Sequence, residues 1–251
     1  MNTFDTERQT EPENPEAQAL QDELAILQEL DRREERTKLL RYKPYNRVRG
    51  FHDGGAIHRE RLLWGGNQQG KTYAGGAETA YHLTGKYPPD WKGKRFDRPI
   101  RAWAASDGYR AARDAAQRTL VGPPEDESAW GTGLIPGDDL LGWARASVGV
   151  PNLLDHVRVQ HHRNVGTEAE PVYDTDGISV LSFKSYDQGR AKWQGETLDL
   201  VWFDEEPPYD VYIEGLSRTN ATGGIVYCTF TPLKGFTELV QAFIDECGMP
   251  D

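Results

Sequence analysis

The chain has 251 residues, a net charge of −11 and two cysteines, Cys228 and Cys247. This length can bury one substantial core, so we expect one α/β domain with an appendage and not two full domains. The cysteines lack the spacing of a zinc site or a disulfide framework, and no apolar stretch approaches the length of a membrane span. The acidic balance argues against a protein that coats nucleic acid over its whole surface.

The first 41 residues are predicted to differ from the rest. Residues 1–15 are rich in Glu, Asn, Thr and Pro, and we expect them to be disordered. From Glu16 to about Arg41 leucines recur among charged residues as in an amphipathic helix. Its apolar face packs either on its own domain or on a partner. Tyr45 and Phe51 follow, and each either stacks on a nucleotide base or packs in the core.

An eight-residue segment then fits the phosphate-binding pattern G-x-x-x-x-G-K-[ST]. It follows an apolar run, 62–64, that is predicted to be a strand, and it precedes a predicted helix over 73–82. In this motif backbone amides and a helix N-terminus bind phosphate groups. Lys71 would reach the β- and γ-phosphates, and the Thr72 hydroxyl would bind Mg²⁺. The sequence thus predicts that ATP and Mg²⁺ bind at Gly65, Gly66, Asn67, Gln68, Gln69, Gly70, Lys71 and Thr72.

The middle of the chain gives weaker signals. We expect a strand over 100–105, then a helix to about Leu120 that is capped by Ser106 or Asp107. Residues 121–142 are predicted to form a loop-rich segment. Residues 152–159 are predicted to form a short helix or strand. Residues 178–184 are predicted to form another strand.

A second motif is an apolar run, 198–203, that ends in carboxylates. Such a run is typical of a buried strand, and Asp204 at its end would hold Mg²⁺ through the hydration shell of the ion. Glu205 would accept a proton from the water that attacks the γ-phosphate. The alternative is a strand that ends in a solvated acidic loop, and we expect Glu206 and Asp210 to be solvated charges of this kind.

A further strand is predicted over 224–229. The predicted strands alternate with helical or loop connections, which indicates a mostly parallel sheet flanked by helices. The long interval between Lys71 and Asp204 favours an additional strand between the two motif strands. We therefore predict an α/β P-loop NTPase fold of the ASCE, RecA-like type over 42–251, preceded by the tail and helix of 1–41.

Three segments together resemble the ATPase domain of the large terminase subunit of tailed bacteriophages, over roughly Tyr42 to the end. They are residues 63–72, residues 193–207 with the sequence WQGETLDLVWFDEEP, and residues 229–235 with the sequence TFTPLKG. The resemblance implies an ATP hydrolase that translocates double-stranded DNA into a procapsid. It also implies a homo-oligomeric ring on the portal protein, fed by a small terminase subunit in the host cell cytoplasm. The isolated chain is either such a ring or a monomer.

By the same resemblance, Thr229 and Thr231 would belong to a coupling motif that senses the γ-phosphate. Arg190 is the candidate arginine finger for a neighbouring subunit, with Arg110, Arg113 and Arg218 as alternatives. Because no later carboxylate cluster follows, we expect no endonuclease activity in this chain. Two other functions stay open: a helicase-like DNA-remodelling ATPase, and a nucleotide-dependent ring scaffold without useful turnover.

Overall fold

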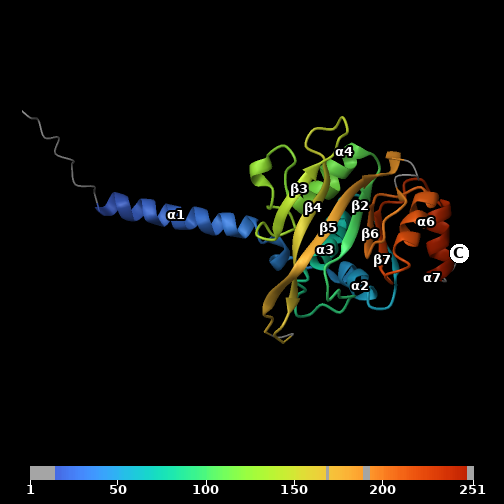
Figure 1. Ribbon diagram of the computed structural model, residues 1–251, viewed down its shortest axis with the longest axis horizontal. Helices are drawn as coiled ribbons and strands as arrows, with labels where there is room; N and C mark the ends of the chain where they lie inside the picture. Colours follow the sequence, from blue (N-terminus) through green and yellow to red (C-terminus); the bar gives the residue numbers. More distant parts are fainter. Residues whose placement is uncertain (1–14, 168–169, 189–192, 248–251) are drawn as a thin grey trace, which may run out of the picture. The chain divides into compact units, whose positions relative to one another are not determined.

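Figure 1 shows the computed structural model, in which residues 15–247 are described except 168–169 and 189–192. The chain divides into two compact units between Glu35 and Arg36. The first unit contains helix α1 (Pro15–Glu35), in which Glu29 pairs with Arg32 and Arg33. The helix ends before the predicted Arg41. The tail predicted over 1–15 lies, except for Pro15, outside the described residues.

The second unit is built on a sheet whose described strands number seven. They are β1 (Glu60–Trp64), β2 (Arg101–Ser106), β3 (Leu140–Arg145), β4 (Leu154–Asn164), β5 (Tyr173–Ser185), β6 (Leu200–Asp204) and β7 (Ile225–Phe230). Their order is β1-β7-β6-β2-β5-β4-β3 (Figure 1). The first five strands in this order run parallel; β4 pairs antiparallel with β5, and β3 pairs antiparallel with β4. The prediction of a mostly parallel sheet is confirmed, and β7 is the additional strand between β1 and β6.

Helices cover both faces of the parallel strands. They include α2 (Asn46–Gly54), α3 (Lys71–Thr84), α6 (Tyr209–Arg218) and α7 (Glu238–Cys247). Because strand side chains alternate, Leu200 and Trp202 of β6 pack in one core with α2 and α3. Val201 and Phe203 pack in a second core with α6 and α7. Burial on both faces explains why this strand is a continuous apolar run in the sequence. None of the helices in the described part of the chain is both long and apolar enough to cross a membrane.

The segment after β2 differs from the prediction. Ser106 is the last residue of β2, where it pairs with Asp204 of β6, and its side chain is buried. The chain then turns at Gly108, whose φ of 89° suits glycine. A helical stretch follows as α4 (Tyr109–Ala111), a π-helical segment η2 (Ala112–Gln117) and α5 (Arg118–Val121). The predicted caps Ser106 and Asp107 are therefore wrong, because sheet pairing continues through Ser106.

Other predicted bounds were too short or incomplete. Strand β4 extends to Asn164 and β5 begins at Tyr173, beyond the predicted 152–159 and 178–184. The predicted loop over 121–142 is broken by a 3₁₀ turn, η3 (Glu127–Ala129), and by the start of β3. Helix α2 was not predicted, because only Val48, Phe51 and His52 of its residues are buried.

Candidate active site

The loop that joins β1 to α3 is held on one side by the start of α2. The guanidinium of Arg47 donates a hydrogen bond to the carbonyl of Trp64 at 2.9 Å, directly before the loop. The hydroxyl of Tyr45 donates to the carbonyl of Gln69 at 2.6 Å, near the end of the loop. Arg47 of α2 and Tyr45 directly before the helix therefore contact both ends of the predicted phosphate loop. Phe51 of the same helix is buried in the core, so the alternative of core packing holds for this residue.

Two further carbonyls of the loop are engaged by side chains of the predicted site. The hydroxyl of Thr231 donates to the carbonyl of Gly65 at 2.8 Å and to Oδ1 of Asn67 at 3.0 Å. The ammonium group of Lys71 donates to the carbonyl of Gly66 at 2.6 Å. The carbonyl and the amide of one peptide group point in opposite directions. Each hydrogen-bonded carbonyl therefore fixes the direction in which the next amide of the loop points. Ordered backbone amides in such a loop are the donors that an anion site requires.

A chain of hydrogen bonds joins α3, β6 and β7 at the carboxyl ends of the strands. Thr72 Oγ1 donates to Asp204 Oδ1 at 2.9 Å, and Thr229 Oγ1 donates to the same oxygen at 2.8 Å. The indole Nε1 of Trp202 donates to Thr229 Oγ1 at 2.8 Å. The structure thus brings together Thr72, Asp204 and Thr229, which the sequence assigned to three separate motifs. Trp202 was missed, although its spacing of two from Asp204 places both on one face of β6.

The electrostatics of the site follow from its burial. Burial raises the pKa of Asp204 to about 7, although the hydroxyls of Thr229 and Thr72 donate to it and oppose this shift. Partial burial also lowers the pKa of Lys71, against the opposing charges of Asp204 and Glu205. Both shifts mean that the charged forms of Asp204 and Lys71 are disfavoured without a partner. A cation beside Asp204 and an anion beside Lys71 would therefore be stabilised. Hydroxyl and carboxylate oxygens are ligands that suit Mg²⁺, and Thr72 and Asp204 present such oxygens side by side.

Glu205 and Glu206 lie in different surroundings, although they are adjacent. The side chain of Glu205 is exposed, and its charge acts on both Lys71 and Asp204. Glu206 is buried and accepts a hydrogen bond from the hydroxyl of Thr237. The prediction that Glu206 is a solvated charge is therefore wrong, because the segment after β7 covers it.

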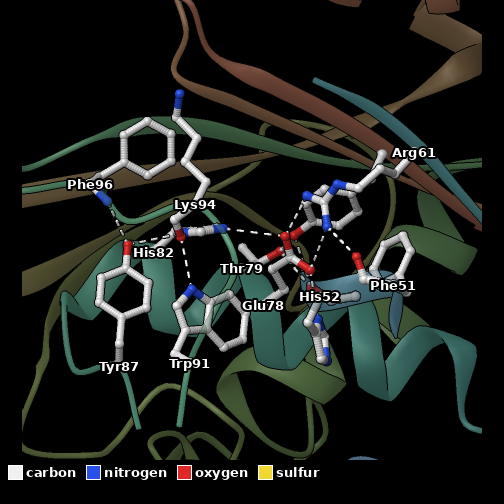
Figure 2. A network of polar contacts seen from close by, with 12 residues as sticks. Phe51, His52, Arg61, Glu78, Thr79, His82, Tyr87, Trp91, Lys94 and Phe96 are labelled. Atoms are coloured by element: carbon white, nitrogen blue, oxygen red, sulfur yellow. Dashed lines mark hydrogen bonds and ion pairs between the residues drawn. The ribbon is translucent and has the colours of Figure 1, made fainter. Parts of the chain in front are cut away.

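Behind the loop, a buried network connects α3 to β1 and α2 (Figure 2). Glu78 of α3 accepts hydrogen bonds from Arg61 of β1 at 2.5 and 3.1 Å. His52 Nδ1 lies 2.7 Å from the same carboxylate, and His82 Nε2 lies 3.4 Å from it. Burial alone would raise the pKa of Glu78, but the charge of Arg61 and the two histidines hold it well below its usual range. The network fixes the strand before the phosphate loop against the helix after it.

The predicted arginine finger, Arg190, lies outside the described residues. Among the alternatives, Arg113 pairs with Asp114 at 2.7 Å and Arg218 pairs with Glu214 at 2.8 Å. The side chain of Arg110 is exposed. The identity of a finger therefore stays a prediction.

The fold and this site define a P-loop nucleotide-binding domain of the α/β class. The profile of the family described as terminase large subunit, T4likevirus-type, N-terminal, matches residues 62–250. The chain belongs to this family, which confirms the resemblance found in the sequence.

Individual relatives agree with this result. The chain is 42% identical over 233 residues to the large terminase subunit of Salmonella phage P22, and 26% identical over 237 residues to that of Enterobacteria phage LP7. These alignments take in 88% of this chain but 45% and 46% of the relatives, so the chain spans about half of their length. A solved large terminase ATPase domain from Thermus phage P74-26 superposes with a TM-score of 0.52 at 18% identity. The match covers 82% of this chain and 72% of that one, and it supports the fold.

Proposed function

We propose that this chain is an ATPase motor domain that hydrolyses ATP with Mg²⁺ and translocates double-stranded DNA into a procapsid. The hydrogen bond from Thr72 to Asp204 carries the proposal, because it joins two motifs that lie 132 residues apart. It places two oxygen ligands next to the phosphate loop, where an ATP-bound Mg²⁺ would need them. Membership of the terminase family supports DNA packaging as the process that uses the hydrolysis.

Each residue of the site has a role in this proposal. The amides of residues 65–70 and the ammonium group of Lys71 bind the phosphates, and Thr72 and Asp204 hold Mg²⁺. The ion, when bound, neutralises charge that develops on the phosphoryl oxygens. Glu205, exposed at the end of β6, accepts a proton from the attacking water. Thr229 and Thr231 couple the loss of the γ-phosphate to the rest of the motor.

The proposed partners are those that the resemblance to large terminase subunits implies. We propose that the domain works in a homo-oligomeric ring on the portal protein, at the portal vertex of the procapsid in the host cytoplasm. A small terminase subunit would deliver the DNA. Arg190 of one subunit would act as the arginine finger for its neighbour, because charge on the γ-phosphate is commonly stabilised by such a residue.

Steady-state ATP hydrolysis, measured with and without double-stranded DNA and portal-bearing procapsids, tests the proposal. Turnover should require Mg²⁺ and rise when DNA and procapsids are both present. Glu205→Gln should bind ATP but lose turnover by about 10²-fold or more, as expected for a lost general base. Lys71→Ala should lose nucleotide binding. Asp210→Asn, which alters an exposed acid in the first turn of α6, should behave as the wild type.

The same measurements separate the alternatives. Wild-type turnover in Glu205→Gln would remove Glu205 as the base. Stimulation by DNA alone, with strand separation, would favour the helicase-like enzyme. Nucleotide binding without turnover, even with procapsids present, would favour the ring scaffold.

A further inference from the structure

The backbone of Glu205 adopts a conformation that is unfavourable for its residue type. Its φ is 83°, in the left-handed region that glycine occupies readily and other residues rarely. Such a conformation is strained and persists only where surrounding groups hold it. Gln68 in the phosphate loop has a positive φ of 59° as well. Left-handed backbone at residues other than glycine thus occurs both in the phosphate loop and directly after Asp204.

Two hydrogen bonds hold the backbone of Glu205 in this conformation. Its amide donates to the carbonyl of Thr229 on β7 at 3.1 Å. Its carbonyl accepts from the hydroxyl of Tyr186 at 2.8 Å. The same hydroxyl lies 3.3 Å from the carbonyl of Ala105 and 3.4 Å from that of Asp204. One phenol oxygen therefore lies where the ends of β2 and β6 meet the turn that carries Glu205.

The position of Tyr186 is itself fixed. The residue begins the 3₁₀ turn η4 (Tyr186–Gln188) directly after β5, and 7% of it is exposed. Its ring lies 6.3 Å from that of Trp193 and 6.1 Å from that of Phe203, both fully buried. Burial raises the pKa of Tyr186 well above its usual value, so its hydroxyl stays protonated and acts as a donor. A rigid donor of this kind can impose one backbone conformation on its acceptor.

We propose that Tyr186 is a positioning residue that holds the backbone of Glu205 left-handed and so directs its carboxylate towards the attacking water. The inference rests on the proposed function, because it takes Glu205 to be the base. Tyr186 itself is not the base and does not bind nucleotide in this scheme. Its effect on the reaction passes entirely through Glu205.

Tyr186→Phe removes the hydroxyl and keeps the buried ring. We expect kcat to fall by about 10- to 100-fold, since small misplacements of a catalytic group have effects of this size. The KM for ATP and the Kd for a non-hydrolysable ATP analogue should stay within about twofold of the wild type, because the phosphate loop is unchanged. In Glu205→Gln, adding Tyr186→Phe should cause no further loss of turnover, since residues that act through one another are not additive.

Tyr81→Phe is the matched control. The hydroxyl of Tyr81 is also buried and also donates to a backbone carbonyl, that of Leu39 at 3.2 Å, away from Glu205. The two variants should lose similar stability in thermal melts, and all kinetics are taken well below each melting temperature. Only Tyr186→Phe should lower kcat.

The outcomes distinguish this inference from the proposed function. Full turnover in Glu205→Gln overturns the proposed base and this inference with it. If Glu205→Gln loses turnover while Tyr186→Phe keeps full activity, this inference is overturned and the proposed function is not. This inference is also overturned if Tyr186→Phe raises KM at constant kcat, or if it slows Glu205→Gln by the same factor as the wild type.

Discussion

Helix α3 approaches the sheet so closely that a single methyl group should disturb it. A Cβ atom added at Gly75 would lie 2.5 Å from Nε1 of Trp202 and 3.0 Å from Cγ2 of Thr229. Contact distances between carbon atoms are about 3.5–4.0 Å, so Gly75→Ala forces an indole with no exposed surface to move. Alanine gains about 0.5–1 kcal/mol in helix propensity, but overpacking costs about 1–3 kcal/mol. We expect a net loss of about 1–2 kcal/mol.

Gly50→Ala is the control, because the propensity gain is the same and the clash is absent. Gly50 lies inside α2, and no atom lies within 4 Å of a Cβ added there. In thermal melts Gly50→Ala should raise the melting temperature by about 1–4 °C and Gly75→Ala should lower it by about 2–8 °C. Gly75→Ala should also weaken Mg²⁺-dependent nucleotide binding, because the displaced Trp202 donates to Thr229. If both variants melt above the wild type, the close approach of helix and strand is refuted.

Two further predictions concern the buried network behind the phosphate loop. Glu78→Gln leaves the buried Arg61 without a counter-charge and should lower the free energy of unfolding by about 3–5 kcal/mol in urea titrations. Asp90→Asn, which breaks an exposed pair, should change it by at most about 1 kcal/mol, and equal losses would contradict the argument. Burial lowers the pKa of His82 below 6.5. The contribution of the neutral, buried His82 to the stability of the fold is therefore fully present above pH 6.5 and is lost as the pH falls through its pKa. His82→Gln should therefore show a flatter dependence of melting temperature on pH than wild type, and an unchanged slope would exclude His82 as the cause.

The sequence predicted the parts of the site that are contiguous. The phosphate loop is a local pattern of glycines, lysine and threonine between a strand and a helix, so its residues can be recognised from the sequence alone. Strand β6 is equally local, since burial on both faces makes it an unbroken apolar run up to Asp204. The interval between these motifs also predicted a strand between them, although not which segment would form it.

Contacts between distant segments could not be predicted in the same way. Arg47 of α2 and Tyr45 directly before it reach the loop, and the sequence of this short, mostly polar helix gives no sign of these contacts. Glu206 follows two other carboxylates in the sequence, yet Thr237 from beyond β7 covers it. Ser106 fits the residue preference of a helix cap, but the register of β2 with β6 keeps it in the sheet. In each case the deciding partner lies far away in the chain.

The position of β7 explains how one strand could report on the state of the nucleotide. Thr229 lies in β7, and Thr231 directly follows its last residue, Phe230. Thr229 bonds to Asp204, the proposed Mg²⁺ ligand, while Thr231 bonds to Gly65 and Asn67 of the phosphate loop. The carbonyl of Thr229 also accepts from the amide of Glu205. A shift of the loop or the ion on loss of the γ-phosphate would therefore act on β7 from both neighbouring strands, β1 and β6, and reach the proposed base through the backbone. In the proposed mechanism, β7 would carry this coupling because it lies between the two motif strands, β1 and β6.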